Sequence, residues 1–186
     1  MARPLSFDSH AVVDAAMQAF WSGGVASTSV DDLLRATGLS RSSLYNSFGN
    51  REGLMQAAIA RYGREQSAAI RRLFEKRSLE QALTALFMEA ATTNNDSRGC
   101  LLVNAVGELH AGPGDDIEAV RNALADIAAT LEGAIRAADP RRDDARQLCV
   151  AAMAAIAGLR TLQRADLPLD VRREAAHRLV RGLIAG

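Results

Sequence analysis

Apolar residues recur at helical spacing along almost the whole chain, and no stretch alternates apolar and polar residues as a half-buried strand would. Glycine, proline and asparagine interrupt this pattern, and each interruption predicts a turn between two helices. Acidic residues open several of the predicted helices, as the helix dipole favours. The pattern therefore predicts an all-α protein. We expect helices over residues 9–22, 30–37, 41–48, 51–77, 79–93, 99–111, 115–138, 142–165 and 170–184.

Composition fits a helical protein of one or two domains. The chain has 186 residues, of which 48% are hydrophobic, and only 4 are proline, so long helices are easily accommodated. We find no apolar run of 18 residues and no apolar signal-peptide core at the N-terminus, and we therefore expect a cytoplasmic protein without a membrane partner. Cys100 and Cys149 are too few for a secreted disulfide scaffold, and we expect both to be reduced thiols.

The segment VDDLLRATGLSRSSLYNSF, residues 30–48, predicts a helix-turn-helix unit. Gly38, Leu39 and Ser40 separate two short helices, and the glycine suits the left-handed conformation that a sharp turn often needs. Each helix has an apolar inner face that can pack against the other. These inner residues are Val30, Leu33 and Leu34 in the first helix, and Leu44 and Phe48 in the second.

The outward face of the second helix carries short hydrogen-bonding side chains. They are Arg41, Ser42, Ser43, Tyr45 and Asn46, and no acidic residue occurs from 38 to 49. Such side chains can enter a DNA major groove without filling it. The alternative is a merely solvated hairpin, although serine and asparagine are poor helix formers for that purpose. The chain has 22 basic and 22 acidic residues, so DNA binding must depend on where the charges lie rather than on their sum.

Residues 9 to 62 resemble the DNA-binding domain of the TetR/AcrR family of transcriptional regulators. The matching pieces are VVDAAMQAFWSGG, STSVDDLLRATGLSRSSLYNSF and GNREGLMQAAIARY, in that order and at the family's spacing. The chain departs from the family at Val25, where an aromatic residue is usual, and at Gly23, where a polar residue is common. Both are packing positions at a loop.

The resemblance implies a recognition helix over residues 41–48, within a motif over 29–48. On this basis Ser42, Ser43 and Asn46 are candidates for base edges, and asparagine suits a bidentate pair with adenine. Tyr45 and Arg41 are better interpreted as phosphate contacts. Arg51, at the start of the next helix, could bring charge and free backbone N–H groups near a phosphate.

We predict a helix-turn-helix domain over residues 1–50 and a larger helical domain for effector binding and dimerisation over 51–186. The larger part matches the family in length and helical layout. It also contains RGCLLVNAVGEL, residues 98–109, which resembles the sixth helix of one TetR-like subgroup.

The candidate effector-binding residues are Cys100, Asn104 and Glu108, which fall at i, i+4 and i+8 and hence on one helix face. Buried asparagine and glutamate would be costly without a partner or ligand. The alternative is that Asn104 and Glu108 face solvent or a neighbouring helix, and that Cys100 is a plain core residue.

The walls of an effector cavity must be largely aliphatic, because all eight aromatic residues lie at or before Phe87. Such walls suit a compact, mainly apolar effector better than a large flat molecule that stacks on rings. The wall residues that we expect are Leu83, Leu86, Leu102, Val103, Leu131, Met153 and Ile156.

We expect dimerisation through the last two helices. The stretch LCVAAMAAIAGLRTL, residues 148–162, is nearly free of charge and rich in small residues, and Val171, Ala175, Leu179 and Leu183 form a stripe on the final helix. The alternative is that 148–162 is the core helix of a monomer. A two-fold symmetric dimer, which the family resemblance also implies, would match a palindromic operator.

No enzyme motif is present: we find no nucleophile elbow, phosphate loop or metalloprotease His–Glu pair, and no cofactor is expected. Three scattered histidines, His10, His110 and His177, show no metal-ligand spacing, so no metal is expected. The prediction is a DNA-binding regulator, in particular a repressor, that binds a palindromic operator as a homodimer and is released by a small effector. A thiol-based sensor switched through Cys100 and a helical protein–protein adaptor without DNA binding are the alternatives.

Overall fold

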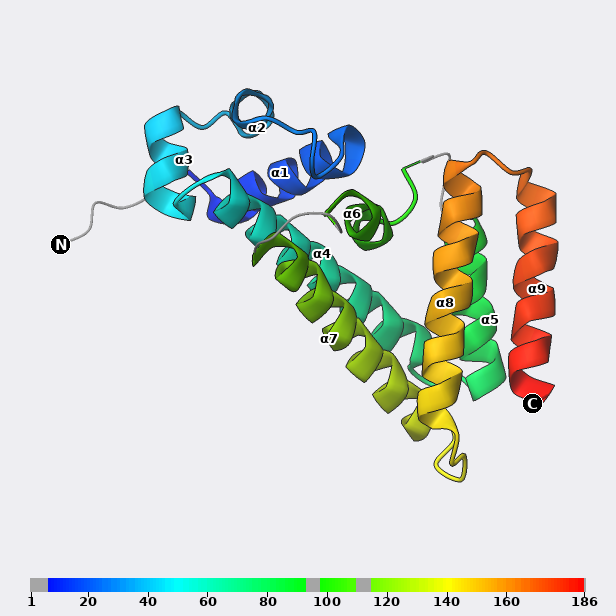
Figure 1. The fold of residues 1–186 in the computed structure, drawn as a ribbon. Coiled ribbons are helices and arrows are strands. Elements are labelled where there is room, and N and C mark those ends of the chain that lie inside the picture. Colours follow the sequence, from blue (N-terminus) through cyan, green and yellow to red (C-terminus); the bar gives the residue numbers. More distant parts are fainter. Residues whose placement is uncertain (1–6, 93–97, 110–114, 186) are drawn as a thin grey trace.

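A computed structural model of the chain describes residues 7–92, 98–109 and 115–185, and all regular structure within them is helical (Figure 1). The all-α prediction is confirmed. The helices are α1 (Ser9–Gly23), α2 (Val30–Thr37), α3 (Arg41–Phe48), α4 (Arg51–Phe74), α5 (Leu79–Thr92), α6 (Leu101–Leu109), α7 (Asp115–Ala138), α8 (Ala145–Arg164) and α9 (Leu169–Ala185). The predicted helix ends at 93, 110 and 111 lie outside the described residues.

Helix α4 ends at Phe74, three residues before the predicted end at 77. No glycine or proline marks this end in the sequence. Instead Lys76 adopts a left-handed backbone conformation with φ 58°, and the Arg77 guanidinium donates from Nη1 to the Leu73 carbonyl at 2.6 Å. A side chain from beyond the helix thus satisfies a carbonyl that the helix leaves open.

Helix α8 begins at Ala145 rather than 142, because the Arg142 N–H donates to the Asp139 carbonyl at 3.2 Å and closes a turn first. Among the described helices it is the one that is long and apolar enough, by length and composition, to cross a membrane. Because Arg146, Gln147 and Arg160 interrupt it, this helix is not a continuous apolar run of 18 residues. Only 28% of that apolar stretch is buried within the chain, so much of α8 presents small and apolar residues outward.

Three groups of helices are visible in Figure 1: α1 to α3 at one end of the molecule, α5, α8 and α9 at the other, and the long pair α4 and α7 lying side by side between them, with α6 above the pair. The pair is close-packed, since a Cβ on Gly63 of α4 would lie 3.1 Å from the Ala123 Cβ of α7. Glycine at this position permits the approach of the two helices.

Two hydrophobic cores meet within α4. The first core joins α1–α3 to α6 and the beginning of α7 and includes residues up to Tyr62 of α4, whereas the second begins at Ile70 and joins α5, α8 and α9 to the end of α7. Helix α4 therefore belongs to both halves of the molecule. The domain division at residue 50 stays a prediction.

Candidate nucleic-acid interface and ligand cavity

The turn between α2 and α3 holds the second helix in a fixed orientation. Gly38 has φ 69°, in the left-handed region as expected, and its N–H donates to the Leu34 carbonyl at 3.0 Å. Leu33 and Leu44 are fully buried between the helices, and the Ser40 hydroxyl caps α3 by accepting the Ser43 N–H at 3.1 Å. Local hydrogen bonds and apolar packing thus decide which side of α3 faces outward.

A second cap fixes the start of α2. The Ser29 hydroxyl accepts the Asp32 N–H at 3.2 Å, while the Asp32 carboxylate accepts the Ser29 N–H at 2.9 Å. Hydrogen bonds from the Ser29 side chain and backbone lower the pKa of Asp32, so this carboxylate is charged at neutral pH at the positive end of the helix dipole.

The outer face of α3 presents the residues that the sequence predicted there. Arg41, Ser42, Tyr45 and Asn46 are exposed, and Ser43 is half-buried. Tyr45 is 45% exposed, and the Tyr45 and Asn46 side chains make no hydrogen bond to any other residue that the structure describes. An exposed aromatic ring beside an unengaged amide is available to a partner.

Three of these residues already have local partners. The Ser43 hydroxyl lies 2.8 Å from the Ser40 hydroxyl. The Ser42 hydroxyl lies 3.0 Å from the Ser40 hydroxyl, and Arg41 pairs with Asp31 of α2 at 2.6 Å. The Arg41–Asp31 pair is exposed on both sides, and such pairs are weak enough to exchange for a phosphate.

Arg51 does not face outward, contrary to the sequence prediction. Its Nε donates to the Thr28 carbonyl at 2.7 Å, its Nη2 donates to the Val25 carbonyl, and the guanidinium carbon lies 5.4 Å from the centre of the Phe20 ring. The hydrogen bonds of this side chain thus go to carbonyl groups of the α1–α2 loop. Arg51 is therefore a structural residue, and its side chain is not available to a phosphate in this conformation.

Asn104 and Glu108 of α6 are also engaged within the chain rather than in a cavity. The Asn104 Nδ2 donates to the Arg98 carbonyl at 2.7 Å, and the Glu108 Oε2 accepts the Ala26 N–H at 3.0 Å. The reason is topological: α6 packs against the first core, so its polar face meets the α1–α2 loop. Cys100, Asn104 and Glu108 therefore do not converge on one site, which corrects the prediction.

Arg98 forms a second link between the α6 region and α1, which the sequence did not reveal. Its Nη1 donates to the Gln18 side chain at 2.7 Å, and its guanidinium carbon lies 4.1 Å from the centre of the Trp21 ring. With Glu108 at the other end of α6, two polar side chains tie this helix to the N-terminal helices. A lone arginine before a glycine gives no sequence signal of such a role.

A cavity of about 670 Å³ lies between α4, α5, α6, α7 and α8. Most of its lining is aliphatic, and the expected wall residues Leu86, Leu102, Val103, Leu131, Met153 and Ile156 all contribute. Leu83 does not, because it is fully buried in the second core. The polar residues of the lining are Tyr62, Gln66, Glu89, Cys100 and Arg160. Of the three predicted effector-binding residues, only Cys100 lines the cavity.

The two thiols occupy different environments. The Tyr62 hydroxyl donates to the half-buried Cys100 Sγ at 3.6 Å, and burial, followed by the nearby Cys100, raises the pKa of Tyr62 well above its usual range. Tyr62 is thus a protonated donor at any physiological pH. Cys149 is buried, donates to the Ala128 carbonyl at 3.4 Å, and has its pKa raised by burial, as expected of an unreactive core thiol.

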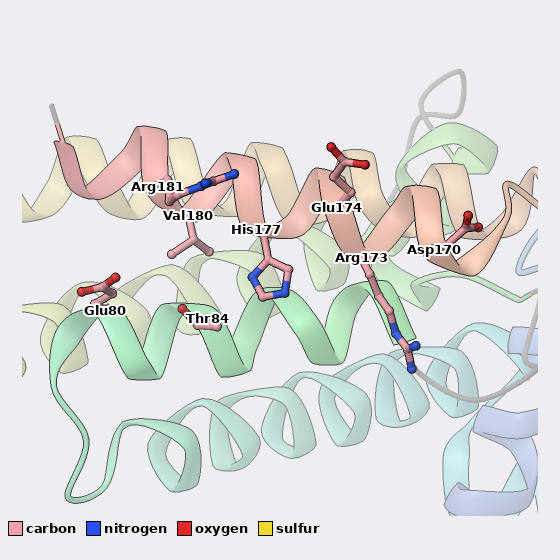
Figure 2. Close-up of a pocket in the computed structure, with 8 residues that line it drawn as sticks. All are labelled: Glu80, Thr84, Asp170, Arg173, Glu174, His177, Val180 and Arg181. Carbon is pink, nitrogen blue, oxygen red and sulfur yellow. The ribbon is translucent and has the colours of Figure 1, made fainter.

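A second groove, of about 660 Å³, lies between α5 and α9 (Figure 2). Acidic and basic side chains mix in its lining, which consists of Glu80, Thr84, Asp170, Arg173, Glu174, His177, Val180 and Arg181. Glu174 is already paired with Arg178 at 2.7 Å.

Among the described residues no group of histidine, cysteine and acidic side chains could hold a metal ion, and His110 lies outside them.

Comparison with known proteins agrees with the helix-turn-helix geometry. Residues 12–58 match the family model described as bacterial regulatory proteins, tetR family. The chain is 38% identical over 118 residues to the HTH-type transcriptional repressor ComR of Escherichia coli (strain K12), and 30% identical over 112 residues to the HTH-type transcriptional regulator YezE of Bacillus subtilis (strain 168). The fold matches that of a cysteine mutant of the TetR family transcriptional regulator CifR, with a TM-score of 0.79 at 26% identity over 96% of this chain and 98% of that one. These matches support the assignment of the chain as a TetR-family transcriptional regulator.

Sequence similarity to these regulators covers only part of the chain, whereas similarity of fold covers most of it. The alignments cover 61% and 58% of this chain but only 56% and 58% of ComR and YezE, so the chain matches little more than half the length of these relatives. The fold extends further: reduced NemR of E. coli superposes with a TM-score of 0.80 over 91% of the chain at 15% identity. The matched proteins are named as transcriptional regulators, in agreement with the expectation that this chain is not an enzyme.

Proposed function

We propose that this chain is a transcriptional regulator that binds a palindromic operator through α3 as a homodimer and is released by a small effector. The observation that carries the proposal is the outer face of α3. There Tyr45 and Asn46 are exposed and have no side-chain hydrogen bond to a described residue, on a helix whose orientation the Gly38 turn fixes. A protein–protein adaptor would not need this acid-free polar face. The matched CifR structure contains 26-base-pair operator DNA, and ComR is named as a transcriptional repressor.

The proposed DNA contacts follow from exposure and chemistry. Ser42, Ser43 and Asn46 face base edges, whereas Tyr45 and Arg41 contact phosphates. The side chain of Arg51 is excluded from this set because it is held by the Val25 and Thr28 carbonyls. The regulator would act in the cytoplasm, where its operator lies.

The proposed dimer forms through α8 and α9, whose outer faces carry exposed apolar residues. Val150 is 62% exposed and Val171 is 48% exposed, and Leu162 and Leu179 are also exposed. Small residues between them, such as Ala154 and Gly158, let two helices approach closely. An apolar helix face of this extent is costly to leave in water and favours a partner with the same face.

The test is a selection from random duplexes with the full-length protein, followed by binding at rising salt. We expect a palindromic site and an affinity that falls steeply with salt, because phosphate contacts release counterions. Sedimentation should show a dimer at micromolar concentration. A protein that shows no sequence preference over random duplex, or that sediments as a monomer with operator present, contradicts the proposal.

A thiol-based switch is the second candidate, and the position of Cys100 favours it. This thiol lines the cavity and accepts a hydrogen bond from Tyr62, so an electrophile that enters the cavity would meet it. We expect such a reagent to release the wild-type protein from DNA but to leave Cys100→Ser bound. If both proteins respond alike, Cys100 is a wall residue only.

A further inference from the structure

The cavity has one apolar end, which the long helices define. Helices α4 and α7 run side by side (Figure 1), with Gly63 against Ala123. About two turns further along, Ile70 and Leu131 share the second core. Helix α8 approaches the same end, because the Cys149 thiol donates to the Ala128 carbonyl of α7. The lining here, including Met153, is aliphatic.

The polar lining residues gather at the opposite end. Tyr62 lies one residue before the Gly63 approach and donates to Cys100, and the Arg160 guanidinium is close enough to Tyr62 to oppose the rise in its pKa that burial and Cys100 cause. Gln66 lies one helical turn beyond Tyr62 on α4. Seven residues of α8 separate Arg160 from Met153, so the polar and apolar ends lie on the order of 10 Å apart along this helix.

Among the residues that the structure describes, Arg160 is a positive charge without a carboxylate partner. Within the described residues its Nη1 donates to the Gln163 side chain at 3.2 Å, and it forms no ion pair. Gln66, which is half-buried, makes no side-chain hydrogen bond to a described residue. Glu89, which is exposed, has an interaction of its own. A half-buried guanidinium beside aliphatic walls gains most from an anion that brings its own apolar surface.

We propose that the effector is an elongated apolar carboxylate whose head group binds Arg160 and Gln66 and whose tail lies along Ile70, Leu131 and Met153. This inference rests on the proposed function and names the chemical class of its effector. One guanidinium balances the single charge of a carboxylate, whereas a phosphate monoester carries about −1.5 to −2 at neutral pH. This proposal replaces the predicted anchors Asn104 and Glu108 by two residues of other helices, and the expected compact effector by an elongated one.

The experiment is isothermal titration of the full-length protein with three ten-carbon probes below their micelle concentrations: decanoate, decanol and decylammonium. We expect decanoate to bind about ten-fold or more tightly than decanol, since a hydrogen bond to a charged group contributes this much. Decylammonium should bind most weakly. Decanoate should also lower the affinity of the protein for its selected operator.

Variants test the assignment of the head group. Arg160→Gln should abolish the preference for decanoate over decanol while retaining decanol binding, and Arg160→Lys should keep part of it. Arg164→Gln, one turn along α8 at an exposed position, is the matched control and should behave as the wild type. A thermal melt of each variant verifies that it is folded, and decanol binding reports an intact cavity.

Three results would overturn the inference: decanol binding as tightly as decanoate, a preference for decanoate that survives Arg160→Gln, or no binding of any probe. Each is separable from failure of the proposed function. If the protein selects an operator but shows no preference for decanoate, only the effector proposal fails. If the protein shows no sequence preference for DNA, the proposed function fails, whatever binds in the cavity.

Discussion

Helices α3 and α6 both carry a face of polar side chains, and they use it differently. On α3, Tyr45 and Asn46 face solvent and have no hydrogen-bond partner among the described residues. On α6, Asn104 donates a hydrogen bond to the Arg98 carbonyl, and Glu108 accepts one from the Ala26 N–H. A row of polar side chains on one helix face thus remains available to a partner when the helix lies at the edge of the molecule. When the helix lies between other elements, the same row forms hydrogen bonds within the chain.

The largest effect should come from the inner face of α3. Leu44 is fully buried, and Leu44→Ala should lower the free energy of unfolding by about 2–5 kcal/mol, because it removes buried methyl groups and leaves a cavity. Urea denaturation measures the change. Asn46→Ala, on the outer face of the same helix, is the control and should change stability by less than about 0.5 kcal/mol. A large loss of stability in Asn46→Ala would show that the outer face is not free.

The next effect concerns operator preference. Asn46→Ala should relax the preference at one base pair by about 1–3 kcal/mol while leaving others intact, since an asparagine reads an adenine edge. Tyr45→Ala should weaken binding to all duplexes about equally. Selection from random duplexes, run in parallel on both variants, distinguishes the two roles. Equal loss at every position in Asn46→Ala would place this residue at a phosphate instead.

Glu108→Ala should have a smaller effect on stability, because it removes one hydrogen bond between α6 and the α1–α2 loop. Losing the hydrogen bond to Ala26 should cost about 1 kcal/mol of stability and increase hydrogen exchange at the Ala26 amide. We also expect effector to release DNA less completely in this variant. Glu80→Ala, at the far end of the molecule, is a charge-matched control. Unchanged exchange at Ala26 would contradict the role of Glu108.

The smallest effect on effector binding should come from Asn104→Leu. Its side chain does not line the cavity, so probe affinity should change less than about two-fold, whereas the free energy of unfolding should fall by about 0.5–1.5 kcal/mol as the Arg98 carbonyl loses its donor. Titration of the same probes, together with urea denaturation, separates these quantities. A large loss of probe affinity would restore Asn104 as an anchor.

Local chemistry allowed most of the fold to be predicted from sequence. Ser29, Gly38 and Ser40 each act on neighbouring residues, so the bounds of α2 and α3 agree with the prediction. The end of α4 could not be predicted, because Lys76 and Arg77 carry no helix-stop signal and the end depends on a side chain that returns to the Leu73 carbonyl.

Site residues could be predicted only where their partners are close in sequence. The outward face of α3 follows from the spacing of Leu44 and Phe48. Arg51 and Glu108, by contrast, bind carbonyl and N–H groups 23 to 82 residues away, in a loop whose position depends on tertiary packing. Arg160 was missed as a polar lining residue for the same reason, since nothing in its own helix indicates that Tyr62 lies opposite.

The close approach of Gly63 to Ala123 holds α4 against α7 near the middle of α4, so the two ends of α4 are related like the arms of a lever. The helix has 24 residues, about 36 Å, with Arg51 at one end and Phe74 at the other. If an effector pushed on the part of α4 that holds Gln66 and Ile70, the close approach at Gly63 would convert the push into a tilt of the helix. Because Gly63 lies near the middle of α4, the end that carries α3 would then move by a similar distance in the opposite direction. Two copies that tilt together would change the separation of their recognition helices by about twice that distance.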